Sequence, residues 1–281
     1  MKTDTHKMST SFLSHLARLV ADEQISERTA AAYTSDASLF ALWFEQTNGY
    51  VLLSTRFTPT DVKEYKAFLL ARGSKPATVN RKLAALKALA KFYGVTLEVK
   101  GVEQQELGPR WLDRLQQSAL LREAEKAINA ANTEPRQQRA AYTHAIIIIL
   151  LNTGLRVSEL CALDTDDVVV NERSGAFTVR QGKGGKRRTV PLNDEARKAA
   201  GSLLWPLHLR RWQIWHDIAE LGRRAKLAVS PHTLRHTFAH NLSGKVQLDR
   251  VATLLGHANL NTTRKYTAPG ERDLQAAVDT L

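Results

Sequence analysis

The chain has 281 residues, of which 43% are hydrophobic and 24% are charged, so it can build an ordinary hydrophobic core and is not expected to be disordered. Its 40 Lys and Arg residues outnumber 28 Asp and Glu residues, which gives a formal net charge of +12. A charge this positive favours a polyanionic partner, usually nucleic acid, over a merely basic surface. Because Cys161 is the only cysteine, an intramolecular disulfide and a cysteine-rich zinc site are excluded.

No stretch of the sequence is suited to a membrane. The N-terminus lacks the continuous apolar run of a signal peptide. The longest apolar stretch, AIIIILL at residues 145–151, is too short to cross a bilayer. We therefore expect a cytoplasmic protein without a membrane partner.

The first hundred residues predict helices. Apolar residues at helical spacing predict helix over residues 9–47, with Ser26 and its neighbours leading into the most apolar part. The stretch from Thr58 to Asp61 resembles a helix start, because Thr58 or Thr60 can cap the helix and Pro59 suits an early position. Another helix is predicted from Pro76 to a stop at Gly94.

The helical pattern lapses over residues 99–113, where polar residues and a Gly-Pro pair indicate a linker. This predicts a helical domain at residues 1–98 and a second domain at residues 114–281. Both parts carry a net positive charge, as expected if both touch the same polyanion.

The second domain is predicted to be mostly helical, with one strand-like interruption. Residues 176–192 alternate between apolar and polar around a GKGGK tip, which is typical of a β-hairpin. The expected fold is therefore mainly α with a small β-hairpin or sheet: a helical domain followed by a mixed α+β domain.

Four short motifs stand out in the second domain, and each is weak alone. They are TGLRVSEL (153–160), QGKGGKRR (181–188), SPHTLRHTFAHNL (230–242) and LLGHANLNTTRKYT (254–267). GKGGK lacks the spacing of a phosphate-binding Walker loop. His232, His236 and His240 recur every fourth residue and so share a helix face, where paired histidines can hold zinc. However, the Glu of a metalloprotease motif is absent and Arg235 would sit beside the metal, so packing or supporting roles are expected for His236 and His240.

Together and in this order, the motifs resemble those of the tyrosine recombinase (phage integrase) family, in particular its compact two-domain Xer-like and resolvase-like members. The resemblance covers the whole chain and implies a helical core-binding, SAM-like DNA-binding domain ahead of a catalytic domain. The family pattern runs Arg, Lys, His-x-x-Arg, His or Trp, and Tyr. By resemblance, the catalytic residues are Arg156, Lys183, His232, Arg235, His257 and Tyr266.

The resemblance implies a site-specific DNA recombinase. Tyr266 would cut DNA through a 3′-phosphotyrosine intermediate and rejoin it without metal, ATP or any other cofactor. The implied partners are double-stranded DNA with a specific site and further protomers in a tetramer on DNA, with a paralogue or an accessory protein as an open alternative. The tail at residues 271–281 has helical apolar spacing. An isolated helix this short is marginal, so it needs a docking surface, either on a neighbouring protomer or on its own domain.

These residue types suit the chemistry. A tyrosine has a pKa of about 10, so it needs a cationic setting to attack at neutral pH. Arg156 and Arg235 present planar donor forks to the phosphate oxygens, on which charge builds during attack. The two histidines can donate to the phosphate or accept the proton of the incoming hydroxyl. Lys183 on the hairpin tip is placed to protonate the leaving sugar oxygen.

Some assignments stay open at this stage. Lys186, Arg187 and Arg188 are close neighbours of Lys183, and any of them is an alternative acid. The family often carries an acidic residue where this chain has Glu159, which would then orient the arginines.

A simple solvated face is the alternative to DNA contact for the basic residues of the helical domain. The predicted DNA-binding residues are Arg81, Lys82, Lys87, Lys91 and Arg187.

One departure from the family lies between Pro191 and His232, a segment that is usually longer. It holds three tryptophans, Trp205, Trp212 and Trp215, which we expect to pack against other residues.

The alternative functions are a type IB topoisomerase-like enzyme that acts alone on one duplex, a DNA-binding protein that no longer cuts, and a zinc hydrolase.

Overall fold

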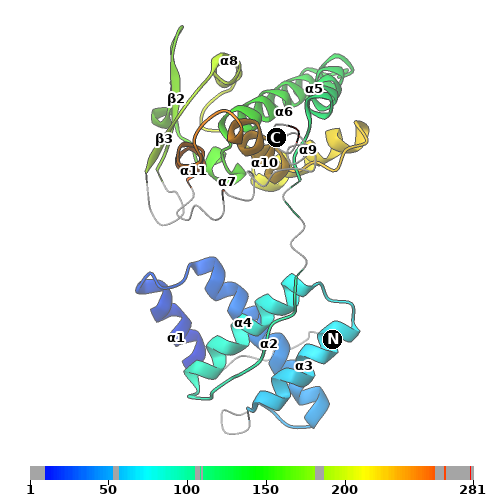
Figure 1. Cartoon of the computed structure of the whole chain (residues 1–281), viewed down its shortest axis with the longest axis vertical. Coiled ribbons are helices and arrows are strands. Elements are labelled where there is room, and N and C mark those ends of the chain that lie inside the picture. The colour runs from blue at the N-terminus through cyan, green and yellow to red at the C-terminus, as the bar shows by residue number, and fades with distance from the viewer. Residues whose placement is uncertain are drawn as a thin grey trace. The chain divides into compact units, whose positions relative to one another are not determined.

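The computed structural model describes residues 10–52, 57–104, 108, 110–180, 187–256, 263 and 279. The chain divides into two compact units, Met1–Glu106 and Leu107–Leu281 (Figure 1). Each unit has a hydrophobic core of its own. They are called the N-terminal unit and the C-terminal unit below.

The described part of the N-terminal unit consists of helices around an aromatic core. At its centre the ring of Phe40 lies 5.1 Å from that of Tyr65 and 5.8 Å from that of Trp43, measured between centroids. Such rings bury large apolar areas and pack favourably when tilted or offset. The helices are α1 (Thr10–Ala21), α2 (Glu27–Asn48), α3 (Pro59–Ala71) and α4 (Pro76–Phe92).

The helix starts of this unit follow capping rules. Thr58 accepts a hydrogen bond from the backbone N–H of Asp61, and the Asp61 carboxylate accepts one from the N–H of Thr58, so both predicted start signals of α3 are present. The prediction of one helix over residues 9–47 is wrong. The chain breaks between α1 and α2, where Glu23 has a positive φ of 54° and Ser26 caps α2 through the N–H of Thr29.

The segment predicted as a linker makes contacts at both ends. Near its start, the Asn80 side chain exchanges two hydrogen bonds with the backbone of Val102, at 2.7 and 2.8 Å. Near its end, the Leu112 N–H donates to the Thr237 hydroxyl at 2.9 Å. These ends therefore belong to the packing of the N-terminal and C-terminal units, respectively.

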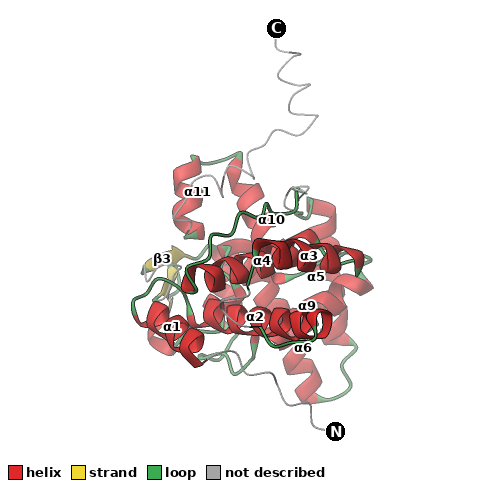
Figure 2. Ribbon diagram, turned by 90° about the horizontal axis from the view of Figure 1, so that it is seen from below, coloured by secondary structure: helices red, strands yellow, loops and turns green. Residues whose placement is uncertain are grey.

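The C-terminal unit is mainly helical with one small sheet (Figure 2). The helices are α5 (Arg114–Asn129), α6 (Glu134–Thr153), α7 (Val157–Leu160), the 3₁₀ turn η2 (Thr165–Asp167), α8 (Asp194–Gly201), α9 (Arg211–Arg224), α10 (Pro231–Ser243) and α11 (Leu248–Leu255). The strands are β1 (Val168–Val170), β2 (Gly175–Val179) and β3 (Arg188–Pro191). The expected mainly helical fold with a small sheet is confirmed.

The sheet is antiparallel, in the order β1-β2-β3. The predicted hairpin is the β2–β3 pair, with Phe177 opposite Val190 and both side chains buried. Strand β1 was not predicted, because three valines after a polar turn are too short to show an alternating pattern. The predicted GKGGK tip lies outside the described residues.

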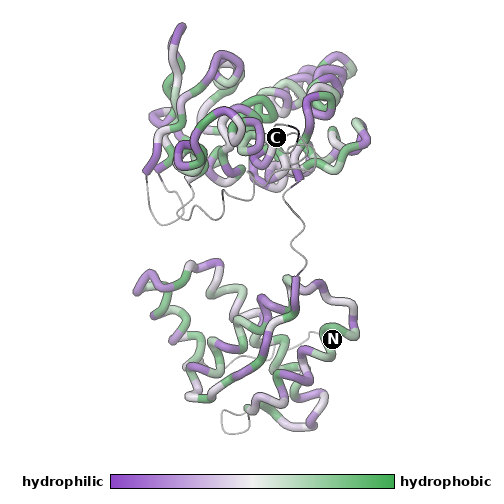
Figure 3. The backbone as a smooth tube through the Cα atoms, in the orientation of Figure 1, coloured by the Kyte–Doolittle hydropathy of each residue, from purple (hydrophilic) through white to green (hydrophobic). Residues whose placement is uncertain are grey.

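Helix α6 is the central element of the C-terminal unit. Its apolar run is buried on several faces, with Ile146, Ile147, Ile149 and Leu150 at most 1% exposed. Other helices of both units alternate between hydrophobic and hydrophilic residues, as expected for one buried face each (Figure 3). Within the described ranges, no helix combines the length and apolar character needed to cross a membrane.

The tryptophans after the sheet behave differently from one another. Trp205 packs against Phe177, with ring centroids 5.4 Å apart, and its indole N–H donates to the carbonyl of Ala200. Trp212 and Trp215 on α9 are 63% and 54% exposed, so the expectation that all three pack is wrong for these two. Their i, i+3 spacing keeps both on one outward face of the helix.

Candidate active site

Arg156 stands at the start of α7, directly after the turn that ends α6. The turn depends on Gly154, whose φ of +62° favours glycine and where an added Cβ would lie 2.2 Å from the ring of Phe238. Glu159 accepts the backbone N–H of Arg156 at 2.8 Å and also its Nη1 at 2.8 Å. The same carboxylate therefore caps the short helix and orients the guanidinium.

Arg235 on α10 is clamped between two helix ends. Its Nη1 donates to the carbonyl of Gly154 at 2.5 Å, and its Nη2 donates to the carbonyl of Leu255 at 2.6 Å. The last carbonyls of a helix lack intrahelical partners and carry partial negative charge, so they favour a cation. The side chain is only 4% exposed, and its Nη1 lies 3.9 Å from Glu159 Oε2. Arg235 thus has one defined position beside the carboxylate that orients Arg156.

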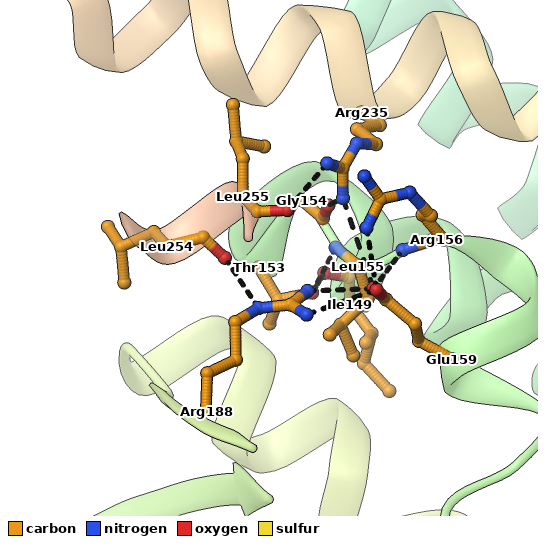
Figure 4. A network of polar contacts seen from close by, with 10 residues as sticks. All are labelled: Ile149, Thr153, Gly154, Leu155, Arg156, Glu159, Arg188, Arg235, Leu254 and Leu255. Carbon is orange, nitrogen blue, oxygen red and sulfur yellow. Dashed lines mark hydrogen bonds and ion pairs between the residues drawn. The ribbon is translucent and has the colours of Figure 1, made fainter. Parts of the chain in front are cut away.

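A third arginine, Arg188 at the start of β3, completes the cluster (Figure 4). Its two Nη atoms donate to the two oxygens of Glu159, at 3.0 and 2.7 Å. Its Nε donates to the carbonyl of Leu254 at 3.1 Å. From the sequence, Arg188 was expected only as a neighbour of Lys183 and an alternative acid, without a place in this cluster. One signal was available, because Arg188 lies two residues before the buried Val190 and so shares its inward face of the strand.

The cluster is cationic overall, since three guanidinium groups meet one carboxylate. Burial by itself works to raise the pKa of Glu159, but hydrogen bonds from Arg188 and from the backbone and side chain of Arg156 outweigh it and hold that pKa below its usual value. Glu159 therefore stays ionised at neutral pH. The excess positive charge at one place is the setting that a phosphodiester requires.

The histidines of α10 do not form one group. His232, in the first turn of the helix and one turn before Arg235, is exposed, and its ring centroid lies 6.4 Å from that of His236. Burial, together with nearby His232 and Arg235, lowers the pKa of His236, which favours its neutral form. His240 instead stacks on Trp111, with ring centroids 4.2 Å apart. Among the described residues, no three His, Cys, Asp or Glu side chains are placed to hold a metal ion.

Both units match protein-family descriptions. Residues 118–205 and 207–272 match the phage integrase family, and residues 11–93 match the phage integrase N-terminal SAM-like domain. The chain belongs to the phage integrase family.

The tyrosine recombinase XerA of Pyrococcus furiosus is 34% identical over 247 residues, which cover 81% of this chain and 82% of XerA. The tyrosine recombinase XerD of Bradyrhizobium diazoefficiens is 32% identical over 306 residues, which cover 95% of this chain and 94% of XerD. The integrase-family chain is therefore a tyrosine-type site-specific recombinase, an enzyme of DNA recombination.

Solved structures show the same fold. The XerH site-specific recombinase bound to a palindromic difH substrate, in a post-cleavage complex, has a TM-score of 0.73 at 21% identity and covers 95% of this chain and 84% of its own. A lambda integrase dimer bound to a COC′ core site has a TM-score of 0.68 at 15% identity, covering 94% of this chain and 96% of its own.

Of the six predicted catalytic residues of this recombinase, three are described. Arg156 and Arg235 meet at Glu159, and His232 lies on the same helix as Arg235. Lys183, His257 and Tyr266 lie outside the described residues, as does the predicted tail apart from Asp279. In the sequence, β3 begins five residues after Lys183, and α11 ends two residues before His257.

The predicted DNA-binding residues differ in exposure. Arg81, Lys87, Lys91 and Arg187 are exposed. Lys82 was predicted to contact DNA, but its side chain is only 11% exposed, with Nζ 3.6 Å from the buried carboxylate of Asp36. Arg81 also pairs with Asp36. Lys82 therefore supports the core of the N-terminal unit, and its amine faces inward.

Proposed function

We propose that this recombinase cuts and rejoins double-stranded DNA through Tyr266, by way of a 3′-phosphotyrosine link and a free 5′-hydroxyl. The link conserves the energy of the phosphodiester, so that rejoining needs neither ATP nor a metal ion. The supporting observation is the cluster in which Arg156 and Arg235 approach one buried carboxylate, because two fixed guanidinium groups can bind the non-bridging oxygens of a phosphate.

The remaining roles follow from the chemistry of attack on phosphorus. His232 and His257 would donate to the phosphate or accept the proton of the attacking hydroxyl. Lys183, in the connection between β2 and β3, would protonate the leaving sugar oxygen.

The DNA partner would run along the basic faces of the chain. Arg81, Lys87 and Lys91 on α4 and Arg187 before β3 are exposed cations suited to backbone phosphates, which supply most of the affinity for DNA but no sequence information. Lys82 is left out of this set because its side chain is only 11% exposed, whereas that of Arg81, which also pairs with Asp36, is 48% exposed. Chromosomal or plasmid DNA in the cytoplasm is the expected substrate, and the reaction is integration, excision or the resolution of dimers or cointegrates.

A trapping experiment tests the proposed chemistry. A nicked suicide duplex that carries the recombinase's own site loses the short strand after cleavage, so that the covalent complex persists. We expect a protein–DNA band on a denaturing gel in the presence of EDTA, lost in Tyr266→Phe and kept in Tyr142→Phe, which removes a hydroxyl that accepts from the Leu204 N–H. A band that EDTA abolishes, or that survives in Tyr266→Phe, would refute the proposed mechanism.

We further propose that four protomers act together on two sites, as the family resemblance implies. Mass photometry of Tyr266→Phe with site DNA measures the assembly directly. The expected species contains four chains and two duplexes. A complex that stays at one chain per duplex at all concentrations would instead support the topoisomerase-like alternative, in which one protein acts alone.

A further inference from the structure

Arg188 makes contacts that its place in a strand does not require. Its guanidinium uses Nε, Nη1 and Nη2 for one carbonyl and two carboxylate oxygens, and the side chain is only 10% exposed. A guanidinium presents a planar fork that matches a carboxylate with two parallel hydrogen bonds, an arrangement that lysine cannot reproduce. The position of this side chain is therefore fixed on three sides.

The partners of Arg188 belong to separate parts of the site. Glu159 is the carboxylate that also binds Arg156. Leu254 lies at the end of α11, next to Leu255, whose carbonyl binds Arg235. Arg188 itself begins β3, five residues after Lys183. One side chain thus joins the hairpin, the start of α7 and the end of α11.

Gly256 gives independent support that this space belongs to the guanidinium. It has a φ of +65° at the C-terminal end of α11, and an added Cβ would lie 2.8 Å from Arg188 Nη1. Any side chain here would press on the arginine as well as strain the backbone. In the sequence, Gly256 directly precedes the predicted site residue His257.

Stability alone does not explain such a pair. Replacing a buried ion pair by well-packed apolar residues is often neutral or stabilising, because desolvation offsets the attraction between the charges. A buried pair does, however, define a geometry, and here the geometry concerns the two arginines assigned to the phosphate.

We propose that Arg188 is a positioning residue of the active site of this recombinase. It fixes the Glu159 carboxylate, and through it the guanidinium of Arg156 beside Arg235, and it ties the hairpin that carries Lys183 to the end of α11. Arg188 acts through these groups and does not itself contact the scissile phosphate. This inference rests on the proposed function, in which Arg156 and Arg235 bind that phosphate.

The test measures recognition of one phosphate without cleavage. In a Tyr266→Phe background, the dissociation constant is measured for site DNA with an ordinary scissile phosphate and for the same DNA with an uncharged methylphosphonate there. The parent should prefer the charged phosphate. In Arg188→Met, the preference for the charged phosphate should fall about tenfold, while the affinity for the methylphosphonate duplex should equal that of the parent. In Arg188→Lys the preference should fall less, because lysine keeps the positive charge but not the planar fork.

The matched control is Arg139→Met. Arg139 also forms a two-bond pair with a carboxylate, Asp217, and it joins α6 to α9 away from the site cluster. It should keep the preference of the parent. With Tyr266 restored, single-turnover cleavage should fall about 10²-fold in Arg188→Met, the size expected when reacting groups are misplaced, and should not fall in Arg139→Met.

The possible failures are distinguishable. If the parent shows no preference for the charged phosphate, the proposed phosphate site is wrong and the role of Arg188 falls with it. If the parent discriminates and Arg188→Met discriminates equally well, the role of Arg188 is wrong and the proposed function stands. If Arg188→Met does not fold, Arg188→Lys provides the test. The inference is overturned if Arg188→Lys prefers the charged phosphate as strongly as the parent does and cleaves at the parental rate.

Discussion

Arg235→Lys is expected to lower the rate of covalent complex formation by about 10³-fold or more, within the range for removing a guanidinium that stabilises a phosphoryl-transfer transition state. The native side chain bonds the carbonyls of Gly154 and Leu255 from two different nitrogens while it lies beside Glu159. A lysine amine is a single point charge and cannot occupy these positions together. Cleavage of the suicide duplex under single-turnover conditions measures the effect.

Binding and folding controls separate chemistry from loss of structure. Arg235→Lys should still bind site DNA and should keep a cooperative thermal transition, because a positive charge remains between the two helix ends. Arg139→Lys, in the pair with Asp217, should cleave at the rate of the unmodified protein. A folded, DNA-binding Arg235→Lys that cleaves within tenfold of that rate would remove Arg235 from the phosphate site.

Lys183→Ala is expected to cut ordinary DNA about 10²–10⁴-fold more slowly, the range for loss of a general acid. The defect should largely disappear when the bridging 5′-oxygen of the scissile phosphate is replaced by sulfur. A thiolate is a good leaving group without protonation, because thiols have far lower pKa values than alcohols. Comparing cleavage rates on the oxygen and sulfur substrates therefore reports the acid specifically.

Lys186→Ala is the matched variant, since Lys186, three residues further along the sequence, is one of the alternative acids. It should cleave both substrates at nearly the normal rate. If Lys186→Ala is slow on oxygen and restored by sulfur while Lys183→Ala is normal, the acid is Lys186. If sulfur restores neither variant, the loop contributes positioning or DNA contact and no proton.

The sequence was most informative where local chemistry decides the structure. The capping pair of Thr58 and Asp61 and the proline at position 59 were sufficient to predict where α3 starts. The break between α1 and α2 was missed, although Ser26 caps α2, because the positive φ of Glu23 has no sequence signature. Strand β1 was missed because its stability comes from pairing with β2, a contact that local patterns do not contain.

The candidate site was predictable in its residue types but not in its connections. The order of motifs predicted Arg156 and Arg235 and, by resemblance, Glu159 as the residue that orients them, but the bonds of Arg235 to the helix ends at Gly154 and Leu255 are visible only in the fold. Arg188 shows the same limit, since its partners lie 29 and 66 residues away in the chain. Long-range polar contacts of this kind leave little trace in one sequence.

Burial was misjudged for several large side chains. Lys82 falls among basic residues but turns inward, because the buried carboxylate of Asp36 needs a cation. Trp212 and Trp215 have large apolar side chains, yet they face outward on α9. Composition gives the average burial of a residue type, whereas the position on a particular helix face determines the individual case.

The most direct test of the proposed mechanism is to identify the residue to which the DNA becomes covalently linked. The covalent complex is formed with EDTA present, digested with nuclease and trypsin, and analysed by mass spectrometry. Trypsin should cut after Lys265 and Arg272, so the peptide YTAPGER should carry a nucleotide remnant joined through its 3′-phosphate to Tyr266. A remnant on any other residue, or on a 5′-phosphate, would contradict the assignment of Tyr266 as the nucleophile and the phosphate geometry built around Arg156 and Arg235.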